Sequence, residues 1–160
     1  MGLYGRIPEE LPPVVLASPV TTNGGVTSDY MSLKLVAGLV FIECTFTQAV
    51  GHATGIDIVQ ATAVDGTGAK AITNALPIWS NTDISLTSVN TRRTDAITYN
   101  VDVAAKNQIV IFQVDPAGFD IAGGFDCLGV TVDNSSAASD LVSVVAYVVP
   151  RYKDSNYIVD

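Results

Sequence analysis

Two cysteines and a single histidine are the residues of this chain that could form a nucleophile and its base. Such a pair needs an accessible cysteine in electropositive surroundings. Cys44 lies closer in sequence to His52 than the other cysteine does. Cys44 also alternates with Val40, Ile42 and Phe46, which places it on the apolar face of an expected strand. We therefore predict that Cys44 is a buried, inert thiol.

Cys127 begins an apolar segment within GGFDCLGVTV, residues 123–132. Asp126 precedes it directly, and no lysine or arginine lies within the stretch. A neighbouring negative charge disfavours the thiolate and raises the pKa of a thiol, so we predict no catalytic role for Cys127. From Leu128 onward, alternate residues form the apolar face of the strand, while Cys127 and Phe125 share the opposite face. We expect a neighbouring chain or an N-terminal arm to cover that second face.

Aspartates recur through the last third of the chain, which raises the question of calcium. Their spacing does not match an EF-hand loop, which needs acids at positions 1, 3 and 5 and a glutamate at 12. We interpret them as turn and strand-end residues that accept hydrogen bonds from nearby backbone amides, with calcium binding as the alternative. One histidine and no Cys-x-x-Cys motif predict no metal site and no cofactor. The aspartates concerned are Asp115, Asp120, Asp126, Asp133 and Asp140.

The chain contains no G-x-S-x-G, P-loop or G-x-G-x-x-G motif. Trp79 and the six tyrosines could line a carbohydrate groove, but aromatic residues at scattered positions are more often core or interface. These patterns predict no catalytic residue, and we expect that the protein is not an enzyme.

The elements that carry these residues are expected to be strands. Apolar residues make up 48% of the chain and charged residues 15%, with few straight-chain helix formers and many β-branched and turn-forming residues. The formal net charge of −8 would repel phosphate, so we expect no nucleic-acid partner. The longest apolar runs, 35–42 and 141–149, are about half of the roughly 20 residues that a membrane-spanning helix needs. We therefore expect no membrane association.

Turn signals divide the chain into about eight strands without a convincing helical period, which predicts an antiparallel two-sheet sandwich. We predict a jelly-roll type, with an immunoglobulin-like sandwich as the alternative. Four prolines in residues 1–28 predict an extended arm without regular helix or central strand. The sandwich is expected over 29–150 and a loose polar tail over 151–160.

Two segments have the most informative strand patterns. In residues 96–103, the apolar Ile97, Tyr99, Val101 and Val103 alternate with polar residues. This pattern predicts a strand with one buried face and one solvent-exposed face. Residues 108–114 are apolar on both faces, which predicts a central strand or a strand at an interface. Such strands favour self-association.

Four segments of the chain carry a resemblance to known proteins. DYMSLK contributes Asp29, Tyr30, Ser32, Leu33 and Lys34; the next segment contributes Gln60, Ala61, Thr62, Lys70 and Ala71; the last two contribute Gly124 to Leu128 and the pair Arg151-Tyr152. In these segments the chain resembles a family of small virion proteins of tailed bacteriophages. The resemblance covers about residues 26–152, although the middle, 73–95, and the proline-rich start do not match the family pattern.

The resemblance implies a structural protein of the phage head, a decoration or cement protein that binds the shell of major capsid protein and has no catalytic residues. We expect it on the head surface of the virion after synthesis in the bacterial cytoplasm, where two free cysteines would stay reduced. We also expect self-association, most simply as a trimer. The alternative function is a virion binding module that recognises host glycans. The residues predicted to contact a partner are Pro12, Pro13, Val14, Val15, Leu16, Phe125 and Cys127.

Overall fold

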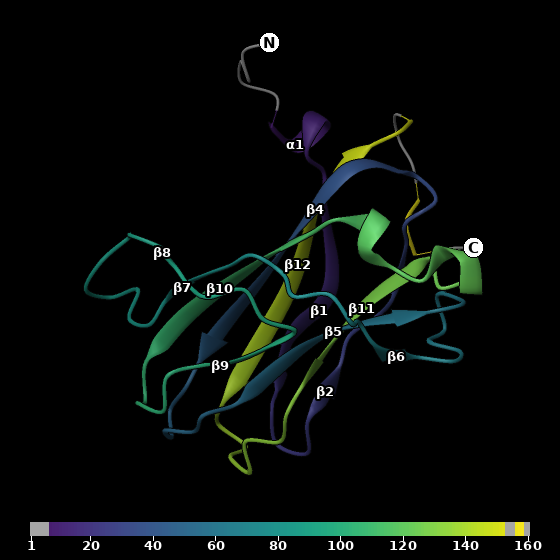
Figure 1. Ribbon diagram of the computed structural model, residues 1–160. Helices are drawn as coiled ribbons and strands as arrows, with labels where there is room; N and C mark the ends of the chain where they lie inside the picture. Colours follow the sequence, from purple (N-terminus) through teal and green to yellow (C-terminus); the bar gives the residue numbers. More distant parts are fainter. Residues whose placement is uncertain (1–6, 153–155, 159–160) are drawn as a thin grey trace.

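The computed structural model describes residues 7–152 and 156–158, which form two antiparallel six-stranded sheets packed as a sandwich (Figure 1). The larger sheet contains, in spatial order, β1 (Pro13–Thr21), β12 (Leu141–Pro150), β4 (Val36–Thr47), β10 (Asn107–Val114), β7 (Ile78–Asn81) and β8 (Thr91–Arg92). The smaller sheet contains β2 (Val26–Thr27), β11 (Cys127–Val132), β5 (Gly55–Ala61) and β6 (Lys70–Ala71), with β3 (Met31–Ser32) on β11 and β9 (Thr98–Asn100) on β5.

The connectivity is that of a jelly roll. Successive main strands pass from one sheet to the other, except β5 and β9, which are neighbours in the smaller sheet. The spatial orders are β1-β12-β4-β10 in one sheet and β2-β11-β5-β9 in the other. The first and last strands therefore lie side by side, as a double Greek key requires. The predicted all-β, jelly-roll sandwich is confirmed, and its strand order differs from the immunoglobulin-like alternative. β7 and β8 extend the larger sheet beyond the jelly roll, and β6 extends the smaller one.

The core fills the space between the two sheets with alternate residues of each strand. Val40, Ile42, Cys44 and Phe46 of β4 are at most 1% exposed, as their alternation predicts. Leu128, Val130 and Val132 of β11 face them from the other sheet and are also buried. Burial of a large aliphatic or aromatic side chain stabilises a fold by about 1.5–3 kcal/mol relative to exposure, so this layer is the main source of stability.

Most of the segment predicted as an arm, 1–28, lies in the sandwich. β1 pairs with β12, β2 pairs with β11, and Leu16 is 1% exposed within the core. Pro13 and Pro19 are tolerated because β1 is an edge strand with irregular register, where fewer backbone donors are needed. The expectation of no regular helix is also wrong, since α1 (Ile7–Glu10) forms a single turn that accommodates Pro8 near its start. Residues 1–6 lie outside the described part.

The tail predicted as loose is partly anchored. Tyr157 is 5% exposed and belongs to the core cluster, and its carbonyl oxygen accepts a hydrogen bond of 2.6 Å from the amide of Ser32. The aromatic ring gains enough buried area to hold this part of the chain against the sandwich. Residues 153–155 and 159–160 lie outside the described part.

The segment 96–103 differs from its prediction. Only Thr98–Asn100 forms a strand, and Val101 is buried at 2% exposure, but Ile97 and Val103 are 42% and 64% exposed. β9 pairs with β5 over only three residues. The flanking residues lie outside the sheet, so their alternating pattern does not bury every second side chain. By contrast, β10 lies between β4 and β7, so the prediction of a central strand at 108–114 is confirmed.

Candidate functional site

Neither cysteine is placed to act as a nucleophile. Cys44 is fully buried, and burial, with a smaller effect from the charge of Glu43, raises the pKa of its thiol to about 12. Cys127 is also fully buried, and its Sγ donates to Oδ1 of Asp126 at 3.5 Å. His52 contributes its backbone carbonyl, which accepts from the side-chain amide of Gln48 at 2.6 Å. The predicted burial of Cys44 is confirmed.

Several aspartates of the last third accept hydrogen bonds from nearby backbone amides. Asp115 accepts from the amide of Ala117 and caps the 3-10 turn η1 (Pro116–Gly118). Asp120 caps η2 (Ile121–Gly123) in the same way. Asp140 is 1% exposed and accepts from two amides of the connection between β4 and β5, residues 48–54. Within the described part of the chain, no three His, Cys, Asp or Glu side chains gather as a metal site would require.

The outer face of the smaller sheet is covered by the chain itself. Tyr30 lies over Cys127 and Gly129 of β11, and together with Val59 it forms a small second apolar cluster. Burial raises the pKa of Tyr30. The expectation that a neighbouring chain covers Cys127 is therefore wrong, because the turn between β2 and β3 places Tyr30 there.

The outer face of the larger sheet carries aromatic and aliphatic residues with polar residues such as Glu43, Thr45 and Gln113 between them, and it lacks such a cover among the described residues. One row crosses the sheet from Val145 of β12 through Glu43 of β4 and Ile111 of β10 to Trp79 of β7. Solvated faces of antiparallel sheets usually carry polar residues, and a contiguous apolar patch indicates an interaction site. We name this patch the apolar face; its residues are Val15, Leu39, Phe41, Ile109, Ile111, Trp79, Val145, Tyr147 and Val149, all half-buried or exposed.

Glu43 is the charged residue at the centre of the apolar face. Its carboxylate accepts from the hydroxyl of Thr45 at 3.3 Å. The pKa of Tyr147 is raised by burial and, to a smaller extent, by the negative charge of Glu43.

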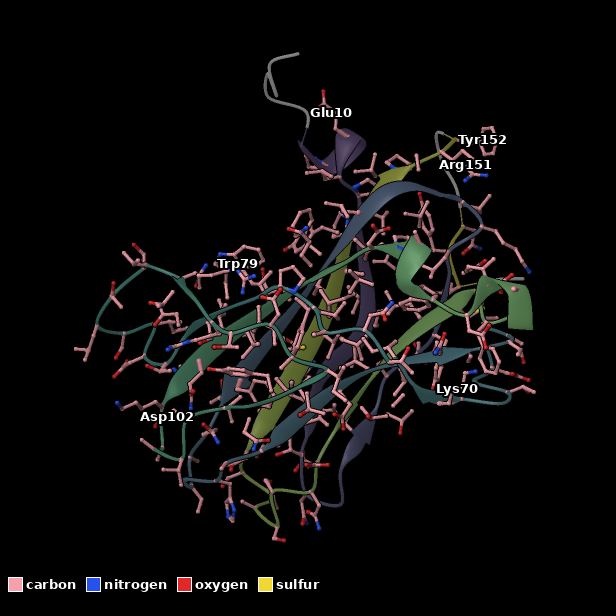
Figure 2. The ribbon with its side chains drawn as sticks, in the orientation of Figure 1. Glu10, Lys70, Trp79, Asp102, Arg151 and Tyr152 are labelled. Carbon is pink, nitrogen blue, oxygen red and sulfur yellow. The ribbon has the colours of Figure 1, made fainter. Side chains whose placement is uncertain are left out.

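Trp79 lies at the β7 end of the apolar face (Figure 2). The guanidinium of Arg92 stacks on its ring at 4.8 Å from the centroid and also pairs with Asp95. One face of the ring is therefore covered by a cation, as in a cation–π pair. A sugar that stacks on Trp79 would have to use the other face or displace Arg92.

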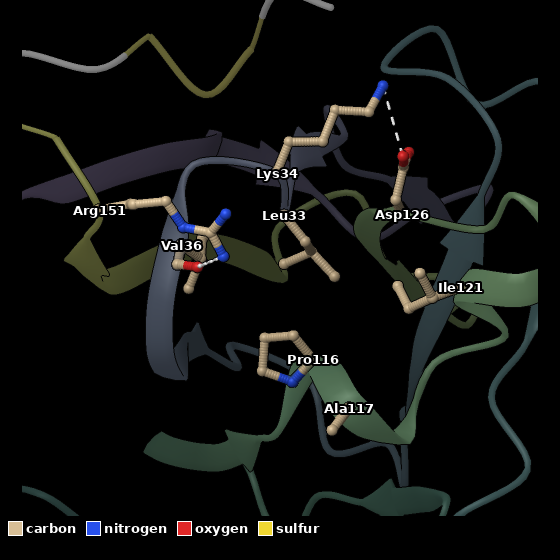
Figure 3. Close-up of a pocket in the computed structure, with 8 residues that line it drawn as sticks. All are labelled: Leu33, Lys34, Val36, Pro116, Ala117, Ile121, Asp126 and Arg151. Carbon is tan, nitrogen blue, oxygen red and sulfur yellow. Dashed lines mark hydrogen bonds and ion pairs between the residues drawn. The ribbon is translucent and has the colours of Figure 1, made fainter.

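Three of the segments that carry the family resemblance meet at one cavity, shown in Figure 3. Lys34 comes from the first segment, Asp126 from GFDCL and Arg151 from the last. Lys34 Nζ lies 3.3 Å from Oδ2 of Asp126, so the fold brings a cation to the acid that has none nearby in sequence. The cavity has a volume of about 390 Å³, and its apolar walls are Leu33, Val36, Pro116, Ala117 and Ile121.

The segment that contains Lys70 lies beside the segment that contains Asp120 and Phe125. Lys70 Nζ is 2.8 Å from Oδ2 of Asp120 and 3.6 Å from the centroid of the Phe125 ring. The hydrogen bonds from Lys70 and from Gly123 lower the pKa of Asp120. The amide of Asp120 also donates to the side-chain oxygen of buried Gln60. These contacts hold η2 against β5 and β6.

The residues predicted to contact a partner differ in their exposure. Leu16 and Cys127 are buried, so neither can contact a partner in this fold, because their side chains already fill the chain's own interior. Phe125 is half-buried under Lys70. Val15 is 55% exposed and belongs to the apolar face. Of the other three predicted residues, Pro12 and Val14 are half-buried and Pro13 is exposed.

The sequence prediction did not include most residues of the two candidate surfaces. The outward positions of β4 and β12, such as Phe41 and Tyr147, were visible as apolar residues on the second face of 38–47 and 139–149. Lys34 and Arg151 were visible only as parts of the family resemblance. Their proximity to one cavity depends on the fold.

Comparison of the chain with protein-family models, curated proteins and solved structures gave no match. The resemblance to virion proteins therefore stays a prediction. Among the described residues, none of the helices has the length and apolar character to cross a membrane.

Proposed function

We propose that this chain is a structural virion protein of a tailed phage, a decoration or cement protein on the head surface that binds and stabilises the shell of major capsid protein. The observation that supports this best is the apolar face of the larger sheet. Aromatic and aliphatic side chains exposed on five strands, with Glu43 among them, suit a protein whose role is to bind another protein surface.

The apolar face offers nine aromatic and aliphatic side chains for a specific contact, on β1, β4, β7, β10 and β12. Aromatic residues, such as Phe41, Trp79 and Tyr147, are the side chains enriched in such interfaces.

Self-association as a trimer is part of this proposal. In a trimer each subunit contacts its two neighbours through unlike surfaces, so the apolar face would pack on a different part of the next subunit. The resemblance carried by residues 26–152 points to the major capsid protein as the second partner. Recognition of host glycans has less support, because Arg92 covers one face of Trp79.

The test is a binding assay with Ile111→Lys on virion shells from which the protein has been removed. Ile111 lies between Glu43 and Trp79 on the apolar face, so an added lysine would disrupt packing there with little effect on the core. We expect loss of shell occupancy and of heat resistance. The matched control is Leu86→Lys, since Leu86 is 81% exposed in a loop outside the face. Equal occupancy of the shells by both variants would contradict the proposal.

A further inference from the structure

The first four residues of β4, Val36–Leu39, have an open edge. β10 pairs with β4 as far as Val114↔Val40 and then turns into η1. Among the described residues, no strand pairs with 36–39 on that side. Val36 is already satisfied within the chain, because its amide donates to the carbonyl oxygen of Leu33 at 3.1 Å and its carbonyl oxygen accepts from Arg151 at 3.4 Å. The register of β4 against β12 is irregular between Val40 and Val36. The backbone N–H and C=O groups that an added strand can satisfy are therefore those of residues 37–39.

A groove runs along this open edge. A cavity of about 380 Å³ is lined by all four edge residues on one side and by Asp115, Pro116 and Arg151 around it. It shares Val36, Pro116 and Arg151 with the cavity of Figure 3, so the two hollows adjoin around η1. The cavity of Figure 3 has mostly apolar walls, with Leu33 and Ile121 among them.

Arg151 lies where the two hollows join. Its guanidinium donates to the carbonyl oxygen of Val36 at 3.4 Å, and it forms no ion pair among the described residues. The other cation of the groove, Lys34, is paired with Asp126 at 3.3 Å. Across the groove, Asp115 accepts from the amide of Ala117 and caps η1. In a chain of net charge −8, Arg151 is thus an exposed cation beside an apolar hollow and an open strand edge.

We propose that this groove binds an extended segment of a partner protein, added as a short strand to residues 37–39 of β4. A carboxylate of the segment pairs with Arg151, and an aliphatic side chain enters the hollow lined by Leu33 and Ile121. Main-chain hydrogen bonds of this kind supply affinity, and the side-chain pockets supply specificity. The groove adjoins the apolar face at Leu39, but Arg151 and the hollow lined by Leu33 and Ile121 lie outside that face. The inference therefore adds a second contact to the proposed function, and it can be tested without a virion.

The first experiment selects peptides from a random octapeptide display library against the wild-type protein. We expect enriched peptides to combine an acidic residue with aliphatic residues in alternation. Their affinity should fall by about tenfold or more for Arg151→Glu, because a charge-assisted pair becomes a repulsion, and should be partly kept by Arg151→Lys. The matched control is Lys106→Glu, a charge reversal near the opposite end of the sandwich, where Lys106 precedes the start of β10. Thermal unfolding of each variant confirms its fold.

The second experiment measures backbone amide exchange with the strongest selected peptide bound. We expect slower exchange at the amides of residues 37–39, since the amide of Val36 already donates to Leu33. No enriched peptide, or equal binding by Arg151→Glu, or unchanged exchange at these amides would overturn the proposal. If Arg151→Glu instead changed the oligomeric state of the protein alone, a segment of a second copy would be the occupant, and the assignment to a partner protein would be wrong.

Discussion

The ring of Tyr30 lies directly on the backbone of Gly129, at the middle of β11 on the outer face of the smaller sheet. A β-carbon at Gly129 would be 2.6 Å from Cε1 of Tyr30, closer than any real contact. On its other side, the ring lies near Gly66, which has a φ of +81° in the 62–69 connection. Two glycines therefore make the space for one aromatic ring, and this ring covers Cys127.

Gly129→Ala is expected to destabilise the protein by about 1–3 kcal/mol, the usual cost of overpacking. The added methyl group must displace Tyr30 or bend β11. The control is Gly38→Ala, because a β-carbon there meets Val149 at an ordinary 3.7 Å. Urea denaturation measures both variants. In a Tyr30→Ala background, Gly129→Ala should cost much less, and full additivity of the two substitutions would contradict the contact.

Asp140→Ala is expected to lower the free energy of unfolding by about 1–3 kcal/mol. Oδ1 of Asp140 accepts from the amides of Ala49 at 2.9 Å and Val50 at 2.8 Å, and the substitution leaves both donors without their acceptor. Asp140→Asn keeps the accepting oxygen, so it should lose less stability. Denaturant unfolding compares the two variants, and equal losses would show that the two amide hydrogen bonds are not the cause.

Asp57→Asn is expected to stabilise the protein at neutral pH and to have little effect near about pH 3. Burial and, second, the charge of Asp133 raise the pKa of Asp57 above its ordinary 3.8. A raised folded-state pKa means that ionisation costs stability, and this cost grows as pH rises from 3.8 through the folded-state pKa. The measurement is the melting temperature against pH for both proteins. A difference that grows toward acid pH would have the wrong sign.

The pKa of Asp83 is shifted downward, in the direction opposite to that of Asp57. Hydrogen bonds from Ser85, with a smaller effect of Lys106, lower the pKa of Asp83. A lowered folded-state pKa contributes stability above the ordinary 3.8, and this contribution is lost as pH falls through the folded-state value. We expect Ser85→Ala to raise the pKa of Asp83 toward 3.8, as measured by the carboxyl carbon shift in an NMR titration. An unchanged titration curve would contradict this contact.

Both thiols are expected to be unreactive in the native protein. Cys44 and Cys127 are free and fully buried, and the pKa of Cys44 is about 12. The thiolate is the reactive form, and burial also excludes the reagent. Dithionitrobenzoate should therefore react with neither cysteine until denaturant is added, after which both should react. Rapid modification of the folded protein would show that one of these sites opens.

Local residue patterns were sufficient for the fold class. Alternation in 38–47 and 125–132 identifies the inward residues of β4 and β11, because successive side chains of a strand point to opposite faces. The burial of Cys44 follows from the same pattern. The turn roles of Asp115 and Asp120 follow from the tendency of aspartate to accept nearby amides. These properties depend only on residues close in sequence.

The tertiary structure alone decided which surfaces are covered and which charges meet. Tyr30 reaches Gly129, and Lys34 reaches Asp126, across about a hundred residues of chain. β1 joins the sandwich because β12, at the far end of the sequence, offers it an edge. An outward apolar residue has the same sequence pattern whether its own chain covers it, as at Cys127, or leaves it open, as at Ile111. Only the packing of distant segments distinguishes the two cases, because cover is a long-range property that local alternation does not encode.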